Sequence, residues 1–180
     1  MRAANYSSMN IFNIDQIKEI NNVIRSNFTK GQDDYAKTAV KTSEVKFVYY
    51  EKIQKYISPF VEFCLTANNN FFGFDIHPLT SMKKLNYNIY KEGSEYTWHI
   101  DAVPTDTVRD IKLTALLNLS EEPYEGGDLV LFRSKEILCQ EFNIPGSAII
   151  FPSFINHKVN KITFGKRYTL AIWMSGPKFR

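Results

Sequence analysis

From Phe71 to the C-terminus, short runs rich in aromatic and β-branched residues alternate with turn residues. Runs of this length, bounded by glycine and proline, are typical of a β-sandwich or a β-barrel. The candidate strands are residues 71–76, 84–90, 95–100, 111–119, 128–132, 137–142, 147–152, 155–160 and 167–174. The breaks between them fall at Gly93, Pro104, Pro123, Gly126-Gly127, Pro145-Gly146, Pro152 and Gly165. We therefore predict that residues 71–180 form a β-sandwich or a β-barrel.

The N-terminal part has a different pattern. Apolar residues recur at helical spacing over 14–28, and Asn13 or Asp15 can cap that helix. A short alternating strand is predicted over 45–49, followed by a second helix over 50–67. Pro59 lies inside this second helix and predicts a kink or a break, because proline has no N–H to donate.

Two N-terminal segments are predicted to lie outside regular structure. Met1–Ser8 is expected to be a leader without ordered structure, and residues 31–36 to form a loop. No repeat, low-complexity tract or linker divides the 180 residues. We expect one domain over 1–180, in which residues 1–70 form a helical support layer and residues 71–180 form the β core.

Composition excludes several classes of function. The net charge of +3 comes without a block of Lys and Arg, so nucleic acid is not expected as a partner. No apolar run is long enough to span a membrane, and residues 1–8 lack the apolar stretch of a signal peptide. Cys64 and Cys139 are far apart and predict buried thiols in a reducing compartment, so we expect a cytoplasmic protein. The sequence does not specify an oligomeric state.

A candidate metal site lies at the end of the strand predicted over 95–100. His99 and Asp101 are two residues apart, so in an extended chain both side chains emerge on one face. A second histidine, His157, would complete a triad of two imidazoles and one carboxylate, which leaves one side of a ferrous ion open. The alternative is that these are ordinary surface or core residues. The third histidine, His77, lacks a ligand-like partner and is expected in a loop.

From Leu85 onward the chain resembles the Fe(II)/2-oxoglutarate-dependent dioxygenases, in particular their prolyl-4-hydroxylase-like branch. The resemblance rests on an ordered set of motifs: Tyr90-x-x-Gly93, His99-x-Asp101, Gly126-Gly127-Asp128, Gly146-Ser147, Phe151-Pro152-Ser153, His157-x-Val159, Gly165-x-Arg167-Tyr168-Thr169 and Trp173-x-x-Gly176-Pro177. It covers more than half of the sequence.

The resemblance implies an α+β fold that is mainly β, with N-terminal helices and a double-stranded β-helix (jelly-roll, cupin-like) core. It implies that His99, Asp101 and His157 bind Fe(II). Arg167, ten residues after His157, would hold the distal carboxylate of 2-oxoglutarate, with Thr169 and Tyr90 as further contacts. Dioxygen is the second cosubstrate, and ascorbate is a further candidate cofactor.

The implied activity is hydroxylation of a C–H bond, with succinate and carbon dioxide as coproducts. We expect a prolyl residue of a protein or peptide as the target, and a free amino acid or other small molecule as the alternative. Residues 102–110 and 31–42 would form flaps over a peptide. The alternative of a different class is a non-catalytic cupin-like metal-binding module, although cupins place their ligands closer together than residues 99 and 157.

Related activities are disfavoured by particular residues. The nucleic-acid demethylases of this superfamily resemble one another in an Arg-x-Asn-x-Thr-x-Arg run, whereas residues 167–173 here lack the Asn, the Thr and the second Arg at those positions. The radical halogenases lack the metal carboxylate that Asp101 provides. Some animal relatives place a tyrosine on the strand over 111–119, where the inward candidates here are apolar, including Leu117. Trp98 and Trp173 are expected to be wall or core residues, and Lys112 is open between a surface, a supporting and a substrate-contacting role.

Overall fold

The computed structural model describes residues 5–29, 41–102 and 109–179. The parts of the two expected flaps that lie within 30–40 and 103–108 fall outside these residues. The elements are, in chain order, β1 (Ser7–Asn10), α1 (Ile14–Ser26), β2 (Glu44–Tyr49), α2 (Tyr50–Ala67), the π-helical turn η1 (Asn68–Phe72), β3 (Lys84–Lys91), β4 (Tyr96–His99), β5 (Arg109–Asn118), β6 (Glu125–Gly126), β7 (Leu129–Phe132), β8 (Glu136–Leu138), the 3-10 turn η2 (Gln140–Asn143), β9 (Ser147–Pro152), β10 (Asn156–Val159), β11 (Ile162–Phe164) and β12 (Lys166–Pro177). The predicted class, mainly β with N-terminal helices, is confirmed.

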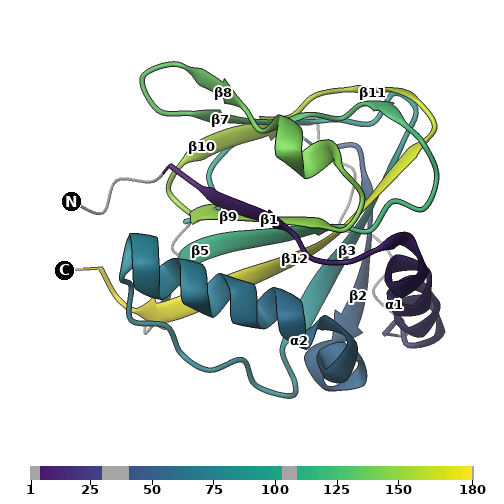
Figure 1. Ribbon diagram of the computed structural model, residues 1–180. Coiled ribbons are helices and arrows are strands. Elements are labelled where there is room, and N and C mark those ends of the chain that lie inside the picture. The colour runs from purple at the N-terminus through teal and green to yellow at the C-terminus, as the bar shows by residue number, and fades with distance from the viewer. Residues whose placement is uncertain (1–4, 30–40, 103–108, 180) are drawn as a thin grey trace.

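Two antiparallel sheets form the core of the fold (Figure 1). The larger has the strand order β1-β9-β5-β12-β3-β2, and the smaller has the order β4-β10-β7-β8. A short pair, β11-β6, adds a third small sheet. The α2 helix runs along the face of the larger sheet that points away from the smaller one (Figure 1).

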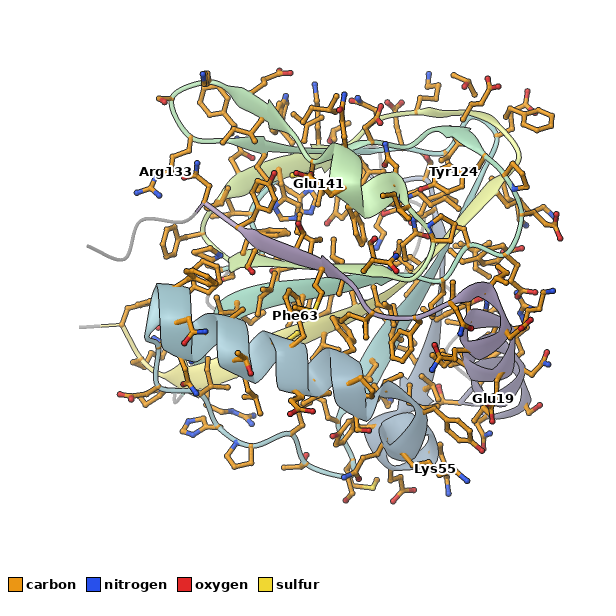
Figure 2. All side chains as sticks on the ribbon, viewed as in Figure 1. Glu19, Lys55, Phe63, Tyr124, Arg133 and Glu141 are labelled. Atoms are coloured by element: carbon orange, nitrogen blue, oxygen red, sulfur yellow. The ribbon has the colours of Figure 1, made fainter. Side chains whose placement is uncertain are left out.

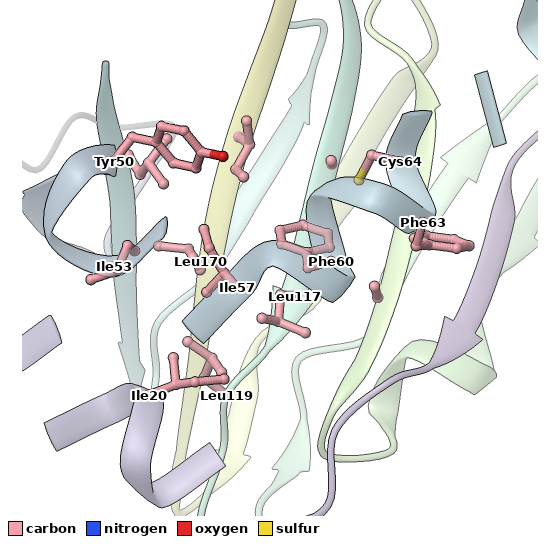
Figure 3. Packing of buried hydrophobic residues seen from close by; sticks show 14 of the residues in the cluster. Ile20, Tyr50, Ile53, Ile57, Phe60, Phe63, Cys64, Leu117, Leu119 and Leu170 are labelled. Carbon is pink, nitrogen blue, oxygen red and sulfur yellow. The ribbon is translucent and has the colours of Figure 1, made fainter. Parts of the chain in front are cut away.

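The larger sheet is therefore buried on both faces. On the helix side, Ile57 and Phe60 of α2 pack in one cluster with Leu117 of β5 and Leu170 of β12 (Figure 3). On the other side, Ile149 and other side chains of the larger sheet meet the smaller sheet in a second cluster. Successive residues of a strand point to opposite faces, and this is why Ile149 belongs to one cluster and Ile150 to the other.

The two helices present polar side chains to solvent. Figure 2 shows Glu19 of α1 and Lys55 of α2 projecting away from the sheets. The α1 helix begins with a capping box, in which the Gln16 N–H donates to Asn13 Oδ1 and the Asn13 N–H donates to Gln16 Oε1, both at 3.0 Å. The predicted cap at Asn13 is confirmed. No helix in the parts of the chain that the structure describes is long and apolar enough to cross a membrane.

The α2 helix continues through Pro59, so the break considered from the sequence is absent. Proline cannot donate to the carbonyl of Lys55, four residues earlier. The hydroxyl of Ser58 donates to that carbonyl instead, at 3.4 Å. Ile57 and Phe60 on either side are fully buried against the sheet. Tertiary packing and a local replacement bond therefore keep the helix continuous.

Three sequence-based expectations are wrong, for identifiable reasons. Residues 71–76 are not a strand, because the side chain of Asn68 donates to Phe74 O at 2.8 Å and accepts from Phe74 N at 3.0 Å. The strand predicted over 137–142 ends at Leu138, and η2 then brings Phe142 into the core. The predicted leader is partly a strand, because β1 pairs with β9 from Ser7↔Ile150 to Asn10↔Ser147.

Candidate metal centre

Three potential metal ligands converge between two neighbouring strands of the smaller sheet. His99 ends β4, Asp101 follows it by two residues, and His157 lies on β10 directly opposite His99. One nitrogen from each imidazole and one oxygen from the carboxylate lie within 4.8 Å of one another. The pairing of β4 with β10 thus brings together groups that are far apart in the sequence.

Backbone contacts orient both imidazoles toward Asp101. Nδ1 of His99 lies 2.7 Å from Thr97 O, and Nδ1 of His157 lies 2.9 Å from Ile155 O. A carbonyl can only accept, so each Nδ1 carries the proton and each Nε2 keeps its lone pair. These Nε2 atoms lie 3.8 Å (His99) and 3.5 Å (His157) from the carboxylate oxygens of Asp101.

Burial keeps both rings neutral. It lowers the pKa of His99 to about 4, with a further contribution from the neighbouring His157, and it also lowers the pKa of His157. The rings are held from the side as well: Tyr96 stacks on His99 with centroids 3.5 Å apart, and Phe151 meets His157 edge-on at 4.9 Å. Neutral, pre-oriented imidazoles are the form in which histidine binds a metal.

The carboxylate of Asp101 is held by a residue that sequence reasoning missed. Thr114 of β5 donates from Oγ1 to Asp101 Oδ2 at 2.6 Å, and the backbone N–H of Asp101 donates to Ser153 O at 2.9 Å. Thr114 is 1% exposed. The signal that could have revealed it is a hydroxyl within the otherwise apolar run Leu113–Leu117.

Arg167 lies at the start of β12, in the same pocket as the three ligands. It is 1% exposed, and its guanidinium carbon lies 5.5 Å from the ring centre of Tyr90 and 5.0 Å from that of Phe142. Its Nε and Nη2 have no hydrogen-bond partner among the residues that the structure describes. These two nitrogens form one edge of the guanidinium fork, the edge that binds a carboxylate in bidentate fashion.

The remaining polar groups of the pocket lie beside Arg167. Thr169 and Asn88 occupy paired positions on β12 and β3, and Tyr90 pairs with Arg167 in the same way. Lys41 also lines this pocket. Burial raises the pKa of Tyr90, so its phenol stays protonated and can donate. All six residues singled out from the sequence, namely His99, Asp101, His157, Arg167, Thr169 and Tyr90, line one pocket.

Other residues considered from the sequence lie elsewhere or face differently. Leu117 points to the helices, and the pocket-facing residues of β5 are Thr114 and Leu116. The expectation that Leu117 faces the pocket was therefore wrong, because its neighbour Leu116 is the residue that faces the pocket. Trp173 lines the pocket, whereas Trp98 packs on Phe132 with centroids 6.0 Å apart.

His77 and Lys112 do not line this pocket. His77 is exposed in a loop, as expected. Cys64 and Cys139 lie elsewhere and are buried free thiols, which was also expected. The ammonium of Lys112 lies 3.3 Å from the ring centre of Phe179. The surface role that the sequence left open for Lys112 is wrong, because this residue is 4% exposed.

The donor set fits a ferrous ion and a dicarboxylate. Two neutral imidazoles and a carboxylate are a common facial ligand set for iron in oxygenases. A buried guanidinium with two unused N–H groups requires an acceptor of opposite charge, because an unpaired buried charge is costly. A carboxylate bound at Arg167 would supply that acceptor.

Comparisons with known proteins agree with this description. Residues 85–175 match the family model of the 2OG-Fe(II) oxygenase superfamily. A PKHD-type hydroxylase of Shewanella frigidimarina is 36% identical over 96 residues, a match that covers 49% of this chain and 41% of the relative. The match thus spans less than half of the relative's own length.

Solved structures share the fold. A prolyl-4-hydroxylase from Pseudomonas putida superposes with a TM-score of 0.71 at 17% identity, covering 97% of this chain and 94% of that one. A prolyl hydroxylase from Trichoplax adhaerens, in complex with a hypoxia inducible factor peptide fragment, gives a TM-score of 0.67 at 20% identity, covering 94% and 83%. At these identities the likeness shows the fold alone, and it confirms the predicted double-stranded β-helix core.

Proposed function

This chain belongs to the 2OG-Fe(II) oxygenase superfamily, and on that premise we propose that it is a dioxygenase that hydroxylates a C–H bond. Membership implies Fe(II), 2-oxoglutarate and dioxygen as cofactor and cosubstrates. The proposed coproducts are succinate and carbon dioxide. The observation that carries the proposal is that the His99–Asp101–His157 cluster and the unsatisfied edge of Arg167 share one pocket.

His99, Asp101 and His157 would hold the metal. The two imidazoles present neutral Nε2 atoms and Asp101 supplies one negative charge, so three protein ligands on one side leave positions for cosubstrate and dioxygen. Bound iron supplies the activation of dioxygen and the oxidative decarboxylation of 2-oxoglutarate. The protein's part is to fix the ligands: Thr97 O and Ile155 O set the two rings, and Thr114 sets the carboxylate.

Arg167 would bind the distal carboxylate of 2-oxoglutarate. Its Nε and Nη2 can donate two parallel hydrogen bonds to one carboxylate, and the rings of Tyr90 and Phe142 hold the guanidinium plane. Thr169 and Tyr90 line the same part of the pocket as further hydroxyl donors. The surrounding apolar residues Leu116, Leu129 and Val159 exclude water and strengthen these charge-assisted bonds.

For the substrate, we propose a prolyl residue within a peptide. The support is the likeness of the fold to prolyl hydroxylases, one of which was solved with a peptide. A fold alone does not select a substrate. The test therefore compares proline-containing peptides with free amino acids, by mass spectrometry for the gain of one oxygen atom. Oxygen incorporation into free amino acids alone would replace the peptide proposal with small-molecule hydroxylation.

The activity itself is tested by incubating anaerobically purified protein with Fe(II), 2-oxoglutarate and oxygen and measuring succinate. We expect succinate from the wild type, none from Arg167→Ala or His99→Ala, and normal production from matched controls. Lys166→Ala removes a neighbouring exposed cation, and His77→Ala removes the exposed histidine. Tight metal binding without succinate for any substrate would favour the non-catalytic metal-binding module.

A further inference from the structure

A chain of hydrogen bonds links a lysine, an amide and a hydroxyl along one side of the pocket. Lys41 Nζ donates to Asn88 Oδ1 at 3.0 Å, and Asn88 Nδ2 donates to Thr169 Oγ1 at 3.3 Å. Asn88 is 5% exposed and Thr169 is 2% exposed. Sequence reasoning had not singled out Lys41 or Asn88.

The ammonium of Lys41 is held in place by its surroundings. Its backbone bridges to Tyr96, and the adjacent Thr42 N–H donates to Glu95 O at 3.1 Å. Its Nζ lies 4.9 Å from the ring centre of Tyr96, the same ring that stacks on His99. The lysine therefore has a defined position between the metal ligands and the Arg167 end of the pocket.

This arrangement fixes the direction of every hydrogen bond in the chain. An ammonium only donates, so the amide of Asn88 must turn its oxygen to Lys41 and its NH₂ to Thr169. Thr169 Oγ1 then accepts from Asn88, and its own hydrogen remains to be donated elsewhere. Among the residues that the structure describes, the hydrogen bond found at this hydroxyl is the one that it accepts from Asn88.

The side chains of Thr169 and Arg167 face the same pocket. Arg167 and Thr169 are two residues apart on β12 and so share a strand face, and both line the pocket. In the reverse orientation of the amide, Asn88 Oδ1 would accept from Thr169 and use up this donor. The lysine thus decides whether Thr169 donates to a ligand or to Asn88.

We propose that Lys41 is a positioning residue that acts through Asn88 to make Thr169 a third donor, beside Arg167, to the distal carboxylate of 2-oxoglutarate. This inference rests on the proposed function. It assigns Lys41 a role in choosing a 2-oxo acid with a second carboxylate, and it does not require Lys41 to touch the cosubstrate.

The test compares binding and turnover of 2-oxoglutarate in variants of the full chain. For Lys41→Met we expect the Kd, measured anaerobically by calorimetry on the Fe(II)-loaded protein, and the KM to rise about tenfold, the value of one hydrogen bond to a charged group, with kcat little changed. Asn88→Asp, which accepts from both neighbours, should behave in the same way. Thr169→Ser should retain wild-type affinity because it keeps the hydroxyl.

A double substitution separates this relay from simple charge attraction. Once Thr169→Val has removed the hydroxyl, adding Lys41→Met should cost nothing more, whereas direct attraction between Lys41 and the dianion would weaken binding again. The affinity for 2-oxopentanoate, which lacks the distal carboxylate, should be the same in all these proteins. Thermal unfolding of each variant checks that it is folded.

The outcomes are distinguishable. Wild-type affinity in both Lys41→Met and Asn88→Asp, or full additivity with Thr169→Val, would overturn the relay while leaving the proposed function intact. A wild-type protein that neither binds 2-oxoglutarate nor forms succinate would overturn the proposed function, and this inference with it.

Discussion

Thr114 donates its hydroxyl proton to Oδ2 of Asp101 at 2.6 Å, joining the middle of β5 to the segment that follows β4. The bond crosses between the two sheets and fixes the one charged metal ligand. It also leaves Oδ1 of Asp101, which lies 3.8 Å from His99 Nε2, without this constraint. A residue of the larger sheet thus positions a metal ligand that follows a strand of the smaller sheet.

Thr114→Val should weaken metal binding. The substitution keeps the shape of the side chain but removes the donor, and the loss of such supporting contacts typically costs about 10–100-fold in metal affinity. The measurement is a competition titration with Co(II), followed by its absorption spectrum. Thr114→Ser keeps the hydroxyl and should stay near the wild type. Equal affinities for valine and serine variants would show that the bond does not matter for the metal.

Metal binding should stabilise the folded protein. A metal that binds only the native state raises the free energy of unfolding by about 2.7 kcal/mol at a concentration one hundred times its Kd. Adding Fe(II) or Mn(II) should therefore raise the Tm of the wild type and of His77→Ala, and a chelator should reverse the rise. Asp101→Ala should show no rise. A metal-dependent Tm that survives this substitution would point to a different binding site.

Gly127→Ala should reduce the affinity for 2-oxoglutarate. Gly127 has a φ of +69°, and a Cβ there would meet Ile162 Cδ1 and lie 3.1 Å from Arg167 Cδ. Gly93→Ala is a matched control, because its φ is +82° but nothing lies within 4 Å of the added carbon. Both variants should lose about 1 kcal/mol of stability from backbone strain.

Only Gly127→Ala should also bind the cosubstrate more weakly, because its added carbon presses on Arg167. Calorimetric titration and thermal unfolding of the two alanine variants separate the effects. If the two variants bound 2-oxoglutarate equally well, the position of Arg167 would not depend on the space at Gly127.

Asn68→Ala should destabilise the fold by about 1–3 kcal/mol, the cost of leaving two part-buried backbone groups without their partners. The side chain of Asn68 satisfies both the N–H and the carbonyl of Phe74. Asn69→Ala alters a neighbouring exposed residue and should have little effect. The measurement is chemical unfolding, and equal midpoints for the two variants would contradict the role given to Asn68.

The sequence predicted those parts of the structure that depend on local periodicity and on turn residues. Short runs rich in aromatic and β-branched residues, bounded by turn residues, located β5, β9 and β12 to within a few residues, and the helical spacing of isoleucines located α1. The sequence-based prediction failed where a side chain or a strand distant in the sequence supplied the hydrogen-bond partners of the backbone. The Asn68 bonds turned the predicted strand over 71–76 into a loop, and pairing with β9 ordered the supposed leader.

The residues of the candidate metal centre were likewise predicted only in part. The residue types and their order indicated His99, Asp101, His157 and Arg167, because iron and a carboxylate each require particular donors. Thr114, Asn88 and Lys41 were missed, since their positions depend on which strands are neighbours in space. Leu117 was also assigned to the wrong face of β5. When both faces of a strand are buried, nearly all of its residues are apolar, so the sequence does not show which residues point to which face.

The pairing of Ser7 with Ile150 carries a consequence for how the chain folds. β1 is hydrogen-bonded to β9, a strand far from it in the sequence, so this border of the larger sheet is completed only when the two segments meet. Until β1 docks, β9 presents unpaired amides and carbonyls that a second nascent chain could bind. Once docked, β1 satisfies these groups of β9 and becomes the edge strand of the sheet in its place.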